Sequence, residues 1–162
     1  MTTALLRRVL DSSLGGCCGF LLIGLVGLTV ADVIGRYVFS APLAGAFELT
    51  ELMLGALVFA ALPLTTLAGE HVEIDMAFAI SPPPVRAIML WLRGLVSTAA
   101  LWTIAWRLVL HGSRLAEDGA TTNALSIPLG PFGWFTATMA ALSGLLALVR
   151  LSAETQQCRR SD

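Results

Sequence analysis

Long apolar segments alternate with short polar connections along this chain. Four of these segments stay apolar over roughly 20 residues, the length that an α-helix needs to cross the hydrocarbon core of a bilayer. The pattern therefore predicts an all-α integral membrane protein with four transmembrane helices. The expected spans cover about residues 14–34, 47–67, 87–110 and 132–151.

The polar remainder is too short for a second, water-soluble domain. With 56% hydrophobic and 13% charged residues and a mean hydropathy of +0.80, the chain lacks the polar surface of a soluble globule. Any chemistry must lie in the membrane or come from a partner. We expect one membrane domain over residues 1–162, with outer loops at 35–46 and 111–131, an inner loop at 68–86 and a cytoplasmic tail at 152–162.

The basic residues predict the orientation of the chain in the membrane. All ten are arginines. Basic residues favour the cytoplasmic side, and a cytoplasmic amino terminus places more of them inside than outside, so we expect the N and C termini to be cytoplasmic. No basic cluster suits a nucleic acid partner. The inner group is Arg7, Arg8, Arg86, Arg93, Arg150, Arg159 and Arg160, and the outer group is Arg36, Arg107 and Arg114.

Charged residues stand at the outer ends of the first two spans. Asp32 and Arg36 lie one helical turn apart, so they can pair with each other or contact a partner chain. Glu48 and Glu51 share a face at the start of the second span. They complement the positive end of the helix dipole, or they bind an arginine of this chain or of another subunit.

A short acidic segment follows the second span. Its alternation of polar and apolar residues from His71 to Asp75 suggests an amphipathic piece at the inner interface. One imidazole with two hard carboxylates, Glu73 and Asp75, makes a weak and open ligand set. The sequence therefore predicts neither a metal site nor a cofactor.

Small residues recur at helical spacing in two spans. Gly27, Ala31 and Gly35 are four residues apart in the first span, a spacing that lets another helix approach closely. In the last span, Ala137 with Ala141 and Ala140 with Gly144 form a similar face. Both faces are expected to pack against helices.

The order of short motifs between the spans resembles the small membrane subunit of TRAP transporters, the tripartite ATP-independent periplasmic carriers, in the DctQ-like family. The resemblance covers roughly Gly16 to Arg150. Its motifs are the Arg36-Tyr37-Val38-Phe39 run after the first span, Glu48 at the start of the second, the Gly69-Glu70-His71-Val72 exit that continues to Ile74-Asp75 and the prolines, and Ile127-Pro128 before the fourth span.

The resemblance implies a function that depends on partners. In such systems a periplasmic binding protein captures an organic acid, and a large multi-span permease subunit carries it inward in a sodium-coupled, elevator-like movement. The small subunit braces the large one in the bacterial inner membrane and is not an enzyme. This chain also lacks the paired half-helices with which transporters bind substrate.

Within that expectation, the polar residues become candidates for a brace rather than for catalysis. We expect Asp32, Arg36, Glu48 and Glu51 to form an outer polar network that fixes the first helical hairpin or docks it on the large subunit. His71 and Asp75 would act in the same way at the inner side, in contact with the partner subunit and the lipid.

Two other classes of protein remain as alternatives. A haem-type membrane anchor of a respiratory complex needs two axial ligands at matched depth, whereas His71 and His111 fall at opposite edges of the membrane. A small proton-coupled exporter needs an acidic residue near the middle of a span, whereas Asp32 and Glu48 lie near span ends.

Overall fold

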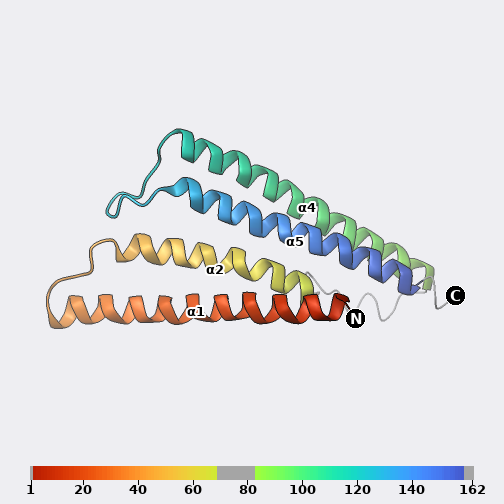
Figure 1. Cartoon of the computed structure of the whole chain (residues 1–162), viewed down its shortest axis with the longest axis horizontal. Coiled ribbons are helices and arrows are strands. Elements are labelled where there is room, and N and C mark those ends of the chain that lie inside the picture. The colour runs from red at the N-terminus through yellow and green to blue at the C-terminus, as the bar shows by residue number, and fades with distance from the viewer. Residues whose placement is uncertain (1, 69–82, 159–162) are drawn as a thin grey trace.

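Two antiparallel helical hairpins make up the fold (Figure 1). The structure is a computed structural model that describes residues 2–68 and 83–158. Within these ranges the chain is helical apart from the connections 39–45 and 118–128. The four described helices are α1 (Thr2–Val38), α2 (Ala46–Ala68), α4 (Pro83–Glu117) and α5 (Leu129–Cys158).

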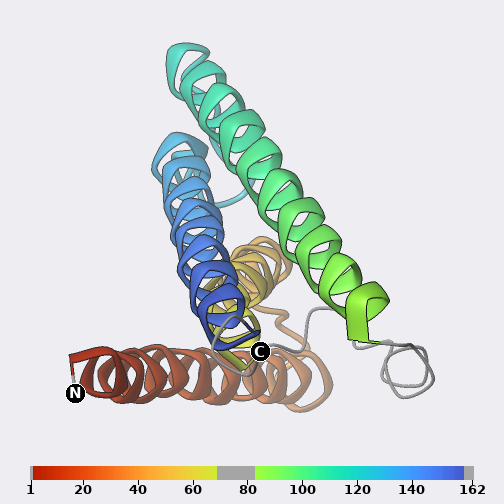
Figure 2. The same cartoon turned by 90° about the vertical axis from the view of Figure 1, so that its right-hand side faces the viewer.

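The helices lie side by side in the order α1, α2, α5, α4. The main contacts join α1 to α2, α2 to α5 and α5 to α4, so α1 and α4 form the two edges (Figures 1 and 2). The connections 39–45 and 118–128 lie at one end of the molecule, which we call the loop end. The start of α1 and the end of α5 lie at the opposite end, here called the terminal end.

Three helices in the described ranges are long and apolar enough to cross a membrane, namely Ser12–Val38, Ala46–Leu67 and Leu129–Leu151. The expected third span, 87–110, lies within the continuous helix α4, but α4 is not among these three. Arg93 and Arg107 interrupt its apolar sequence. An all-helical protein is thus confirmed, while the fourth span and the cytoplasmic position of the termini stay predictions.

Several helices extend beyond the expected spans. A count of apolar residues measures the thickness of the hydrocarbon core, whereas a helix continues into the polar region until a residue ends it. α4 reaches Glu117 because Gly119, with a φ of 59°, ends it in the left-handed conformation. Gly119 N–H then bonds Ala116 O at 3.3 Å and Ala120 N–H bonds Leu115 O at 3.0 Å, which is a Schellman cap.

Small side chains on α5 form the centre of the packing. Ala137, Ala140 and Ser143 are at most 3% exposed, and a Cβ added at Gly144 would stand 3.3 Å from the Trp102 ring on α4. The closest approach is between Gly133 and Gly112, where a Cβ on Gly133 would stand 2.6 Å from the Gly112 Cα. The small face expected on the last span therefore does pack against a helix, and it lets the α4 and α5 backbones meet.

Candidate functional site

The carboxylate of Glu48 joins the start of α2 to the connection between α4 and α5. Its Oε1 accepts a hydrogen bond from Ala124 N–H at 2.6 Å, and its Oε2 accepts one from Leu125 N–H at 3.0 Å. Two adjacent backbone amides that bind one anion form a nest, and hydrogen bonds to an ionised group are among the stronger ones. We call this arrangement of Glu48, Ala124 and Leu125 the loop-end clamp.

The connection 118–128 presents these two amides because its own hydrogen bonds fold it back. Thr122 N–H bonds Ile127 O at 3.0 Å, and the Thr122 hydroxyl accepts a bond from Ile127 N–H at 3.1 Å. Ser126 turns the chain with a φ of 53°. The amides of Ala124 and Leu125 lie inside this turn, where the carboxylate of Glu48 satisfies them.

A packing contact supports the loop-end clamp. Gly45, just before α2, has a φ of 78°, and a Cβ added there would overlap the Leu125 side chain. The position therefore needs glycine for two reasons, its left-handed backbone and the leucine that fills the space beside it. The connection 118–128 thus touches the start of α2 through a polar group and Gly45 through an apolar one.

Asp32 forms a second anchor at the loop end. Its Oδ2 lies 2.9 Å from Arg36 Nη2, and its Oδ1 accepts a hydrogen bond from Leu43 N–H at 3.1 Å. The connection 39–45 is thereby tied back onto α1. Gly35 contributes as well, because a Cβ there would stand 2.8 Å from the Ala41 carbonyl oxygen.

The structure places the expected network residues in separate groups. Asp32 and Arg36 pair with each other, whereas Glu48 binds the 118–128 connection. Glu51 is exposed and has no hydrogen bond or ion pair within the part of the chain that the structure describes. Of the remaining candidates, His71 and Asp75 lie outside the described residues.

The small residues expected to pack helices have different surroundings. Nothing lies within 4 Å of a Cβ added at Gly27, and Ala31 is exposed. The contact between α1 and α2 instead passes through Gly24, where an added Cβ would stand 2.8 Å from the Met53 methyl carbon. Gly27 therefore has open space beside it in the described chain, and the packing of the Gly27 and Ala31 face against a partner helix stays a prediction.

Arg150 makes a second clamp, which sequence reasoning missed. From α5, its Nη1 donates to the carbonyls of Thr66 at 3.1 Å and Leu67 at 3.0 Å. These are last-turn carbonyls of α2, which have no amide partner within their own helix and attract a cation. We call this the terminal-end clamp. In the sequence, Arg150 counted only as a positive charge on the inner side.

The two clamps use their charged groups for structure. Each charged side chain binds backbone atoms of a neighbouring element, and so α2 is held to the α4–α5 hairpin at both of its ends. Within the described ranges, no three His, Cys, Asp or Glu side chains gather as metal ligands would. The fold and the clamps define a helical membrane protein in which two charged groups, Glu48 and Arg150, join α2 to the α4–α5 hairpin.

Comparison with known families identifies this membrane protein more closely. The family described as tripartite ATP-independent periplasmic transporters, DctQ component, matches residues 25–157. The chain therefore belongs to the DctQ family, the small permease component of TRAP transporters. The match confirms the resemblance found in the short motifs of the sequence. No curated protein matches the chain.

Proposed function

We propose that this chain is a brace for the large permease subunit of a TRAP transporter in the bacterial inner membrane. The transporter takes up an organic acid that a periplasmic binding protein delivers, and a sodium gradient drives the uptake. In this role the chain binds no substrate itself. Its task is to hold a fixed shape against which the large subunit moves.

The observation that carries the proposal is the clamping of α2 at both ends. Glu48 fixes its start and Arg150 fixes its end, so α2 is tied to the α4–α5 hairpin by charge-assisted hydrogen bonds. In a membrane, such bonds hold helices together where no hydrophobic drive exists. A brace needs this rigidity.

The edges of the molecule supply surface for a large partner. Side chains on α1 and α4 are widely exposed, with Phe20 at 76% and Trp106 at 66%. Lipid or a neighbouring membrane subunit must cover this apolar area. A small subunit that lies against a larger one fits this distribution, because α1 and α4 each contact mainly one helix of their own chain, whereas α2 and α5 each contact two.

The test is uptake by cells of the native host that lack this chain. Radiolabelled organic acids are supplied with and without a sodium gradient, and the large subunit is followed by immunoblotting. We expect uptake to need both sodium and this chain. Restoration by the natural chain, but not by a Glu48→Ala, Arg150→Ala double variant, would support the brace. Glu51→Ala is the matched control and should restore uptake.

Uptake that continues without this chain, while the large subunit is present at its usual level, would contradict the proposal. Sodium-independent uptake that still needs the chain would overturn only the coupling ion. Restoration by the double variant would show that the clamps are not needed for bracing.

A further inference from the structure

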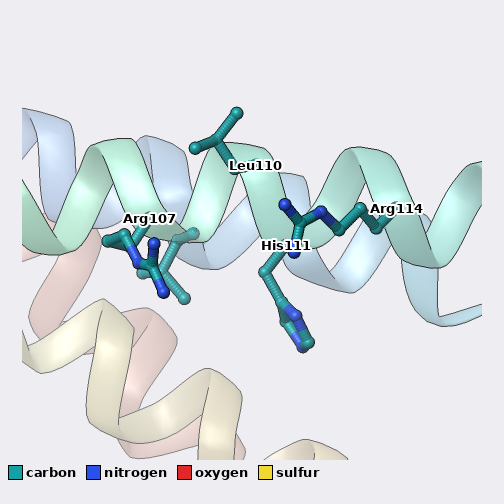
Figure 3. A pocket seen from close by; sticks show the side chains of 5 residues that line it. Arg107, Leu110, His111 and Arg114 are labelled. Carbon is teal, nitrogen blue, oxygen red and sulfur yellow. The ribbon is translucent and has the colours of Figure 1, made fainter.

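Three cationic side chains line one face of α4 near the loop end. Arg107, His111 and Arg114 recur at spacings of four and three residues, which puts them on the same side of a helix. Together with Leu108 and Leu110 they line a cavity of about 280 Å³. Figure 3 shows Arg107 and His111 projecting from the same side of α4, with Arg114 extending back towards His111. We call Arg107, His111 and Arg114 the cationic stripe.

The stripe begins deep beside a membrane span. Gly133 meets Gly112 and Gly144 meets Trp102, so Arg107, midway between these contacts on α4, lies level with the region of Thr138 on α5. The α5 span begins at Leu129. At 1.5 Å per residue, the Arg107 backbone therefore lies level with a point about 14 Å along α5 from the start of that candidate span.

The cationic stripe has no ion pair among the residues that the structure describes. All three side chains are exposed, and none has a hydrogen bond or ion pair to the residues that the structure describes. The carboxylates of Asp32 and Glu48 are already bound elsewhere. A charged side chain at membrane depth is costly, and it normally faces a polar cavity or pairs with an opposite charge.

We propose that the cationic stripe receives carboxylate side chains from a membrane-embedded helix of the large permease subunit. This inference rests on the proposed function, since it names the surface through which the brace binds its partner. The stripe runs along two turns of α4, which matches acidic residues at similar spacing on a facing helix. Leu108 and Leu110 line the same cavity and supply apolar contact area.

The position of Arg107 favours a protein carboxylate over a lipid phosphate as the anion that binds the cationic stripe. Lipid headgroups lie outside the hydrocarbon core, which is about 30 Å thick, so a phosphate would reach Arg114 more easily than Arg107. A helix of another subunit can place an acidic side chain at the level of Arg107. The position of Arg107 along the candidate span therefore supports an acidic side chain of another subunit as the anion.

The test uses this chain co-expressed with the large subunit of its own transporter. A photo-crosslinking amino acid replaces Leu110, which lines the same cavity, and mass spectrometry identifies the adducts; the same amino acid at Leu145, an exposed position on α5, serves as the comparison. We expect Leu110 adducts with the large subunit. Adducts with phospholipid alone, or with a second copy of this chain alone, would overturn the proposal.

Charge variants test the pairing itself. Arg107→Gln with Arg114→Gln should weaken retention of the large subunit by about tenfold or more, because each lost pair leaves a partner carboxylate unmatched. Arg107→Lys with Arg114→Lys keeps the charge and should retain most binding. If the Gln variant retains the large subunit as well as the natural chain does, the role of the stripe is overturned, but the proposed function is not. Failure of the natural chain to retain the large subunit would overturn the proposed function as well.

Discussion

Glu48 Oε2 accepts a hydrogen bond from Leu125 N–H at 3.0 Å, across 77 residues of sequence. This bond and its neighbour at Ala124 make the start of α2 and the connection 118–128 one structural unit. At the other end of α2, Arg150 does the same for the last turn. The clamps explain how two separate hairpins keep one arrangement in a membrane.

Glu48→Gln should loosen the loop end. A carboxamide has a single acceptor oxygen, so one of the two amides would face an NH₂ donor instead of an acceptor. We expect a melting temperature a few degrees lower in detergent and faster proteolysis within the 118–128 connection. Glu51→Gln, three residues along the same helix and without a partner in the described structure, should match the natural chain. If Glu48→Gln and Glu51→Gln lowered the melting temperature equally, the loop-end clamp would be contradicted.

Arg150→Met should destabilise the terminal end. Methionine keeps part of the side-chain length but removes the donors to Thr66 O and Leu67 O. We expect a loss of about 1.5 to 3 kcal/mol in the free energy of unfolding, the range for hydrogen bonds to a charged group. Thermal unfolding in detergent measures this loss. The rate of backbone amide hydrogen exchange should also rise in the last turn of α2. Unchanged exchange there would show that Arg150 does not cap α2.

Gly133→Ala should force α4 and α5 apart. The new methyl group would stand 2.6 Å from the Gly112 Cα, which is backbone and cannot move aside as a side chain can. Overpacking of this kind costs roughly 1 to 3 kcal/mol. Gly27→Ala is the matched control, because nothing lies within 4 Å of its added Cβ. Thermal unfolding of the isolated chain should therefore separate the two variants.

The same control variant tests the expected packing of α1 on a partner. If a helix of the large subunit lies against Gly27, then Gly27→Ala should leave the isolated chain unchanged but weaken its complex. If Gly27→Ala destabilised the isolated chain as much as Gly133→Ala does, the packing described for α5 would be contradicted.

Asp32→Ala should destabilise the chain more than Arg36→Ala. Asp32 binds both Arg36 and the Leu43 amide, whereas Arg36, with a side chain 61% exposed, contributes only the ion pair. We expect a loss of about 1 kcal/mol for Asp32→Ala and less than about 0.5 kcal/mol for Arg36→Ala. Thermal unfolding of both variants gives the order. The reverse order would mean that Arg36 has a more important partner than Asp32.

The parts of the site that follow local spacing were predictable from sequence. Asp32 and Arg36 are four residues apart, and helix geometry alone brings such residues together. The small face of α5 around Ala137 and Ala140 was visible in the same way, and it is buried. The apolar runs likewise predicted the helices, although the end of α4 depends on a cap that a count of apolar residues does not detect.

The two clamps were not predictable in the same way. Glu48 was recognised as a candidate, but its partners are backbone amides of Ala124 and Leu125, which carry no sequence signal. Arg150 reaches carbonyls 83 and 84 residues away, whose identity depends on how α2 and α5 pack. Gly27 shows a further limit of the sequence, since the helical spacing of small residues marks a face that is able to pack without saying which helix covers it.

The most direct test of the central claim is purification of the tagged chain from its native membrane in mild detergent, followed by mass spectrometry. The account predicts recovery of a large multi-span permease subunit in a fixed ratio to this chain, and loss of that subunit when both clamps are removed by Glu48→Ala and Arg150→Ala. Recovery of haem-containing respiratory subunits, or of this chain alone as a homo-oligomer active in proton-driven efflux, would contradict it.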